Sequence, residues 1–202
     1  MVSNIKHSII LFLIIITSNS FADEFLAAGR ASISGDYATA IKLYAKLAKE
    51  GRGGAQYNLA MMYYNGLGTR QDYKRAVYWY TKAAENGDAK AQYYLGYMHA
   101  NGHGVPQSYK ETVYWYTKAA AQNYTKAQYK LGHLYANAKG TPQDYIKAYT
   151  WYEIASKRGE KSARNERDEI AEKMTSEEIE EALSFVKEWL DGSDEDETVI
   201  IE

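Results

Sequence analysis

A period of 36 residues constrains this chain more than any other feature of its sequence. Segments Ala55–Lys90, Ala91–Lys126 and Ala127–Ser162 align without gaps, and the first two are identical at 20 of 36 positions. Self-similarity at a fixed period is typical of repeat proteins, in which each unit buries its apolar face against its neighbours. Over 202 residues, the period predicts one short repeat array.

Each unit is predicted to form two helices. In the first unit Leu59, Met62 and Tyr63 follow an i, i+3, i+4 spacing, which places them on one helical face. A stripe of Ala, Trp, Tyr and Ala recurs later in the units, and we expect its Trp to be the buried centre of the second helix. The predicted core positions are Leu59, Trp79, Tyr80, Leu95, Trp115, Tyr116, Leu131, Trp151 and Tyr152.

A glycine-containing connector joins the two helices of each unit. Gly68, Gly104 and Gly140 occupy its fixed position, which indicates a positive φ that only glycine adopts at little cost. Ala138 shows that the other glycine of the connector is dispensable in one unit. Asp or Ser follows at the expected N-cap of each second helix, so the local signals agree with the period.

The recurring A-Q-Y-x-L-G, N-G-x-G, Q-D-Y and W-Y elements resemble the Sel-one-like repeat family, which is related to the tetratricopeptide repeats. The resemblance implies an all-α fold, a right-handed α-solenoid of antiparallel helix pairs. The predicted organisation is a signal peptide (1–22), an N-terminal tetratricopeptide-like helix pair (23–54), three repeats (55–90, 91–126 and 127–162), C-terminal capping helices (163–190) and an acidic disordered tail (191–202).

The resemblance also implies a non-catalytic scaffold or adaptor. Members of the family serve in envelope signalling, in the assembly of cell-surface complexes and in contact with host cells. The residues of this chain do not indicate which of these roles it has.

Residues 1–22 are typical of a secretory signal. Lys6 precedes an apolar stretch, and Ser20-Phe21-Ala22 is a small-x-small cleavage site. The apolar stretch is about half as long as the ~20 residues that a membrane-spanning helix needs. Cleavage after Ala22 therefore predicts an exported protein, periplasmic or secreted, with no membrane span after signal cleavage.

The sequence contains few residue patterns that could support catalysis. It has no cysteine, which excludes thiolate zinc sites, cysteine nucleophiles and the paired cysteines of a penicillin-binding subgroup of the family. His99 and His103 have a metal-compatible spacing, but Asn101-Gly102 interrupts the helix between them. We expect no catalysis, no cofactor and no metal; a hydrolase of cell-wall or β-lactam amides is the alternative that stays open.

By analogy with tetratricopeptide arrays, the first helices are expected to line a concave groove that binds a protein or peptide partner. Tyr offers rigid contact area, and Asn can bond an extended backbone. The invariant tyrosines are also expected to stack the repeats. The positions that vary between repeats are therefore better candidates for ligand recognition: Met61, Tyr97 and His133 at one position, and Tyr64, Ala100 and Ala136 at the other. The predicted groove residues are Tyr57, Met61, Tyr64, Asn65, Tyr93, Tyr97, Asn101, Tyr129, His133 and Asn137.

The formal charge of −2 is the sum of opposite parts. Residues 23–159 carry a net charge of +8, and residues 160–202 carry −11. A total near zero gives no overall attraction to nucleic acid. The acidic end is interpreted either as a solvated cap face with a disordered tail or as a tail that folds back on the basic array and competes with an acidic partner.

The last predicted helix has one apolar face and is expected to close the array. That face is Ile179, Ala182, Leu183, Val186 and Leu190. A terminal unit has no neighbour to cover its outer side, so such a helix is needed there. A structural role, in which Ile179 or Leu183 supports a homo-oligomer, is a further alternative.

Overall fold

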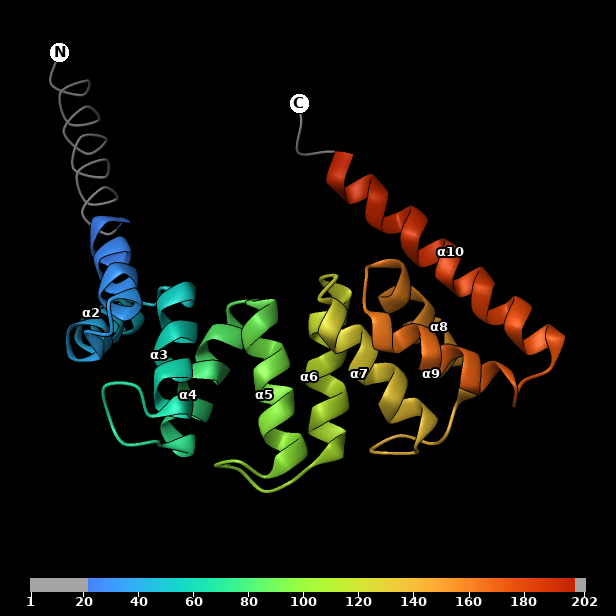
Figure 1. Ribbon diagram of the computed structural model, residues 1–202, viewed down its shortest axis with the longest axis horizontal. Helices are drawn as coiled ribbons and strands as arrows, with labels where there is room; N and C mark the ends of the chain where they lie inside the picture. The colour runs from blue at the N-terminus through green and yellow to red at the C-terminus, as the bar shows by residue number, and fades with distance from the viewer. Residues whose placement is uncertain (1–21, 199–202) are drawn as a thin grey trace, which may run out of the picture. The chain divides into compact units, whose positions relative to one another are not determined.

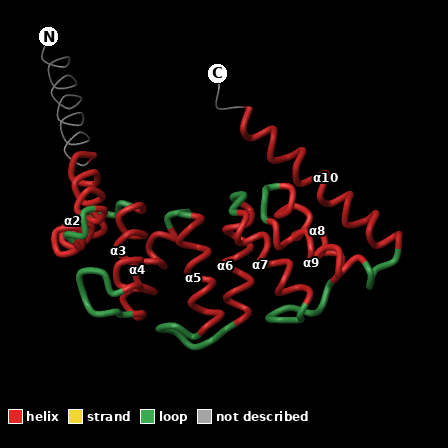
Figure 2. Tube along the Cα trace, viewed as in Figure 1, coloured by secondary structure: helices red, strands yellow, loops and turns green. Residues whose placement is uncertain are grey.

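The computed structural model describes residues 22–198, and every regular element within them is a helix (Figures 1 and 2). The predicted all-α fold of sequential antiparallel helix pairs is confirmed; the right-handed sense of the array stays a prediction. All but the last residue of the predicted signal, 1–22, lies outside the described residues. Within residues 22–198 no helix combines the length and the apolar character that crossing a membrane requires.

The helices form two compact units, divided between Asp88 and Ala89. The first unit contains a helical segment, 22–33, followed by α2 (Tyr37–Lys49), α3 (Gly53–Asn65) and α4 (Tyr73–Glu85). The second unit contains α5 (Ala89–Asn101), α6 (Tyr109–Ala121), α7 (Thr125–Ala136), α8 (Tyr145–Lys157), α9 (Lys161–Ala171) and α10 (Ser176–Thr198). We refer to α3, α5 and α7 as first helices and to α4, α6 and α8 as second helices.

The 36-residue period extends upstream of the segments that are most alike in sequence. Helices α2, α4, α6 and α8 all begin with tyrosine, at intervals of 36 residues, and follow an Asp or Ser N-cap. In each case the side chain of the cap accepts a hydrogen bond from the backbone N–H three residues on, which satisfies a donor that has no partner within the helix. The period thus sets where the second helices begin.

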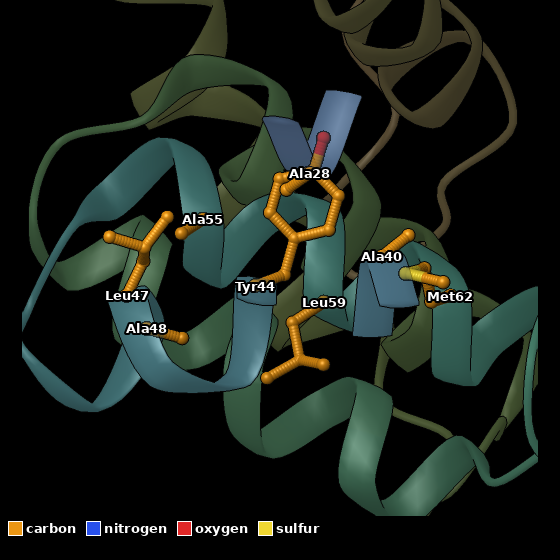
Figure 3. Packing of buried hydrophobic residues seen from close by; sticks show 8 residues of the cluster. All are labelled: Ala28, Ala40, Tyr44, Leu47, Ala48, Ala55, Leu59 and Met62. Atoms are coloured by element: carbon orange, nitrogen blue, oxygen red, sulfur yellow. The ribbon is translucent and has the colours of Figure 1, made fainter. Parts of the chain in front are cut away.

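The core is built mainly from alanines and leucines, with at least one buried tyrosine in each of α2, α4, α6 and α8. Figure 3 shows the cluster of the first unit, with Tyr44 and Leu59 packed among small side chains. In the later pairs Tyr80 and Tyr152 are fully buried and Tyr116 is 3% exposed, whereas the neighbouring tryptophans are only half-buried. The prediction that Trp79, Trp115 and Trp151 are the buried centres is therefore wrong.

Close helix packing explains why tyrosine takes that place. A Cβ built at Gly132 in α7 would lie 2.6 Å from Cδ1 of Tyr152, and one at Gly96 would lie 2.7 Å from Cδ1 of Tyr116. The tyrosine rings fill the space that a side chain at these glycine positions would occupy. The tryptophan is one residue earlier, about 100° round the helix, and so lies at the edge of the contact.

Two features require glycine in the connectors: a positive φ and close contact with the backbone of another helix. Gly68, Gly104 and Gly140 have φ values of 70°, 76° and 75°. A Cβ at Gly140 would lie 2.4 Å from the carbonyl carbon of Tyr109, and one at Gly68 would lie 2.5 Å from the carbonyl oxygen of Tyr37. The connector therefore packs directly on the start of the preceding second helix.

The C-terminal end departs from the predicted closing pair. Helices α9 and α10 each pack against α8. Ala182 and Val186 are buried, but Leu183 is 41% exposed, so its prediction on the buried face is wrong. The indole of Trp189 instead makes an edge-on contact with Trp151, with 5.0 Å between ring centroids. This contact turns the buried side of α10 away from Leu183.

Helix α10 is also longer than predicted. It runs to Thr198, which corrects the predicted disordered tail, 191–202, over residues 191–198; the remainder lies outside the described residues. Thr175 and Glu178 form a reciprocal capping box, with hydrogen bonds of 2.9 and 3.2 Å. The capping box satisfies two backbone N–H groups at the start of the helix that have no partner within it.

Candidate functional site

The three invariant tyrosines of the predicted groove turn toward the second helix of their own pair. Their ring centroids lie 5.3–5.9 Å from those of the buried tyrosines, in the pairs Tyr57–Tyr80, Tyr93–Tyr116 and Tyr129–Tyr152. Tyr93 also lies 5.2 Å from the ring of Tyr124, which precedes the next repeat. Contacts within and between repeats therefore occupy much of the surface of these rings.

Glu166 on α9 forms hydrogen bonds with both tyrosines of the third pair, Tyr129 and Tyr152. Its two carboxylate oxygens accept hydrogen bonds from the hydroxyls of Tyr129 and Tyr152, each at 2.9 Å. Burial, together with the bond to Glu166, raises the pKa of Tyr129 to about 12. Burial also raises the pKa of Tyr93 to about 12. Both phenols therefore stay protonated near neutral pH and are not nucleophilic anions, and the hydroxyl of Tyr129 serves as a hydrogen-bond donor to Glu166.

The variable positions Met61, Tyr97 and His133 occupy equivalent places on α3, α5 and α7 and are all half-buried. An exposed asparagine ends each of these helical segments and donates its Nδ2 to the carbonyl of the variable residue four positions earlier. The bonds are Asn65 to Met61 at 2.9 Å, Asn101 to Tyr97 at 2.7 Å and Asn137 to His133 at 2.8 Å.

These bonds change the role predicted for the asparagines. The amide nitrogen of each asparagine gives a second donor to a carbonyl near the helix end; the carbonyl of His133, for example, also accepts from the backbone N–H of Asn137 at 3.2 Å. The expectation that these side chains bond a ligand backbone is therefore corrected for the nitrogen, which bonds the chain itself. The result is a constant frame that holds a different side chain in each repeat.

Sequence reasoning missed a set of glutamines that complete this frame. Gln71, Gln107 and Gln143 each donate Nε2 to the carbonyl seven residues earlier, at 2.7–2.9 Å. They recur at the 36-residue period, which is the signal that could have identified them. Tyr64, another predicted groove residue, lies with its ring 5.4 Å from that of Tyr73, so the connector closes around it.

A second set of glutamines lies buried inside the units. Gln56 donates to the carbonyl of Ala48 at 3.2 Å and accepts from Asn86 at 3.0 Å, so it joins the ends of α2, α3 and α4. Gln128 makes the equivalent bond to Ala120. A buried amide needs such partners, and each bond locks one repeat to the preceding one.

The structure places His99 and His103, the two histidines with metal-compatible spacing, in different surroundings. His99 is half-buried, and burial lowers its pKa. His103 lies against Tyr97, with 6.0 Å between ring centroids. Among the described residues no group of three or more His, Cys, Asp or Glu side chains is placed to hold a metal ion.

Tandem antiparallel helix pairs, with partly exposed variable side chains on a constant hydrogen-bonded frame, define an α-solenoid scaffold of the tetratricopeptide-like class. The chain belongs to the Sel1 repeat family, whose repeat matches residues 24–51, 54–88, 89–124 and 125–160. The family consists generally of non-enzymatic scaffolds, typically for protein–protein interaction. The first matched repeat covers most of the predicted N-terminal helix pair.

Solved structures agree with this assignment. A protective antigen present in uropathogenic Escherichia coli strains, which has an SLR fold, is 32% identical with a TM-score of 0.70 over 76% of this chain and 33% of its own. A Sel1 repeat protein from Oxalobacter formigenes is 34% identical with a TM-score of 0.68 over 71% of this chain and 59% of its own. The present chain thus spans about a third and about three fifths of their lengths.

More distant similarity shows the fold alone. Cysteine-rich protein B of Helicobacter pylori is 21% identical, with a TM-score of 0.51 over 64% of this chain and 93% of its own. The present chain has no cysteine. No curated protein matches the chain in sequence.

Proposed function

We propose that this chain is an exported adaptor that binds a protein or peptide partner along the first helices of its repeats. Tyr97 and His133, on successive first helices of the second compact unit, are the residues that select the partner. The observation that carries this proposal is the contrast between a constant frame and a variable side chain at one position of each repeat. A scaffold that only stacked its repeats would have no need for Met, Tyr and His at equivalent, partly exposed places.

The chemistry of these side chains indicates the kind of partner. Tyr97 and His133 lie in the same compact unit and belong to successive repeats. Both combine a flat apolar ring with a polar edge, which gives contact area at small entropic cost. Such a pair suits an extended peptide whose apolar side chains alternate with backbone groups able to accept or donate a hydrogen bond.

Substitution of both rings tests the adaptor function. We expect the double variant Tyr97→Ala, His133→Ala to bind the partner about 30-fold or more weakly, because the loss of even one residue that dominates an interface costs at least ~2 kcal/mol. The partner is first obtained by a crosslinking pull-down of the chain from its own envelope fraction, and affinity is then measured with the purified pair.

A matched variant separates binding from folding. Tyr78→Ala removes a tyrosine that is 54% exposed on a second helix and should leave the affinity unchanged. The thermal melting of the helical circular dichroism signal should be similar for both variants and the parent chain. Retention of the partner by a folded double variant would contradict the proposal.

Export is the second part of the proposal, and the composition of residues 1–22 supports it. We expect the chain recovered from cells to begin at Asp23, since the cleavage site ends at Ala22. Mass spectrometry of the intact protein from the periplasmic fraction and the medium measures this directly. Recovery of a full-length chain from the cytoplasm, with none outside it, would count against export.

A further inference from the structure

We propose that two copies of this chain associate by pairing α6 of one copy with α10 of the other. The surface on α6, here the basic stripe, consists of Lys110, Tyr114 and Lys118. The surface on α10, here the acidic stripe, consists of Glu181, Phe185 and Glu188. Both stripes lie outside the first helices, so the inference is independent of the proposed peptide groove.

One repeat further on, in α8, the face equivalent to the basic stripe is already covered by another helix of the chain. The positions equivalent to Lys110, Tyr114 and Lys118 in α8 are Ile146, Thr150 and Ile154. Helix α10 packs on α8, where Oγ1 of Thr150 donates to the carbonyl of Ala182 at 3.5 Å. Ile154 is fully buried. This face of a second helix is therefore shaped to receive another helix.

On α6 the same face is uncovered and differs in chemistry. Tyr114 is 49% exposed, and both lysines of the basic stripe are exposed. Nζ of Lys118 lies 4.9 Å from the ring centroid of Tyr114 and 5.7 Å from that of Trp115, so the ammonium rests on aromatic surface. The two lysines are eight residues apart, about 12 Å along the helix. An occupant must therefore offer carboxylates on either side of an apolar group.

The acidic stripe of α10 has this complementary pattern. Phe185 is 48% exposed, and Glu181 and Glu188 are exposed on either side of it. The two carboxylates are seven residues apart, about 10.5 Å along the helix. When the two stripes face each other, Phe185 meets the ring of Tyr114 and each carboxylate meets an ammonium. The net charges of +8 over residues 23–159 and −11 over residues 160–202 favour the same pairing.

Both stripes belong to the second compact unit, so a two-fold axis can form the contact twice and close a dimer. Helix α4 carries a similar series in Lys74, Tyr78 and Lys82. There Nζ of Lys82 is already 3.3 Å from Oε2 of Glu85, whereas the residue equivalent to Glu85 in α6 is Ala121. The full charge of Lys118 is therefore available to an acidic partner, which favours α6.

Sedimentation equilibrium of the full chain tests the pairing. We expect a reversible dimer at an ionic strength of about 0.01 M that dissociates at about 1 M, because the screening length falls from about 30 to 3 Å. Lys110→Glu with Lys118→Glu should raise the dissociation constant at least about tenfold, since it turns two attractive pairs into repulsive ones. Glu181→Lys with Glu188→Lys should do the same.

The decisive sample is an equimolar mixture of these two charge-reversed variants. Each stripe then meets its complement in the other chain, so the mixture should form a heterodimer although neither variant self-associates. The matched control, Lys126→Glu with Lys161→Glu, makes the same change in net charge at exposed residues of α7 and α9 and should dimerise like the parent chain. A chain that is monomeric at both ionic strengths, a dimer indifferent to the stripe variants, or a mixture that stays monomeric would each overturn the proposal.

Discussion

Replacing Gly140 by alanine is expected to lower the free energy of unfolding by about 2–5 kcal/mol. Two causes act together. An alanine at φ 75° is strained by about 1–2 kcal/mol, and its Cβ would lie 2.4 Å from the backbone carbonyl of Tyr109. A backbone group cannot rotate away as a side chain does, so overpacking adds about 1–3 kcal/mol. Urea unfolding followed by circular dichroism measures the loss.

Gly102 provides the control for the two causes. It has a similar φ of 67°, but a Cβ there would meet only ordinary contacts, the nearest at 3.5 Å from Cβ of Gln107. Gly102→Ala should therefore cost only the conformational strain, about 1–2 kcal/mol. Equal losses in the two variants would show that the contact between the connector and α6 contributes nothing to stability.

Truncating Tyr152 to alanine is expected to cost about 3–5 kcal/mol, the range for a fully buried aromatic side chain. Its ring fills the space beside Gly132, contacts Tyr129 and carries a hydroxyl bonded to Glu166. The denaturant midpoint of purified variants measures the loss. In a repeat array the transition can be broad, so the slope must be compared between variants before the midpoints are.

Two further variants separate the contributions to this loss. Tyr152→Phe keeps the ring and removes only the bond to Glu166, so it should cost about 0.5–1.5 kcal/mol. Trp115→Ala removes a half-buried ring and should cost less than Tyr152→Ala. A larger loss at Trp115 would mean that the tryptophans, rather than the tyrosines, hold the helix pairs together.

The candidate site could be anticipated only in part from the sequence. The period placed Met61, Tyr97 and His133 at equivalent positions of the first helices, and it identified their neighbours of constant type. It did not show that Asn101 bonds the carbonyl of Tyr97, because an amide can serve either its own helix or a ligand. That choice depends on the geometry of the helix end, which appears only in three dimensions.

The sequence by itself determined the elements of this protein. Helix starts, N-caps and glycines at positive φ depend on residues within a few positions of one another, so a 36-residue period with the appropriate turn residues specifies them locally. The family assignment depends on the same recurring residues. What the sequence determined, in short, is the conformation of each repeat and the order of the helices.

The tertiary structure alone decided which faces are buried. In the α5–α6 and α7–α8 pairs, tyrosine rather than tryptophan fills the core because Gly96 or Gly132 on the facing helix leaves space for its ring. Leu183 is exposed and Trp189 is partly covered because α10 packs on α8. Periodicity gives the angle of each side chain about its own helix, but burial depends on where the neighbouring helix lies, and residues distant in the sequence set that position.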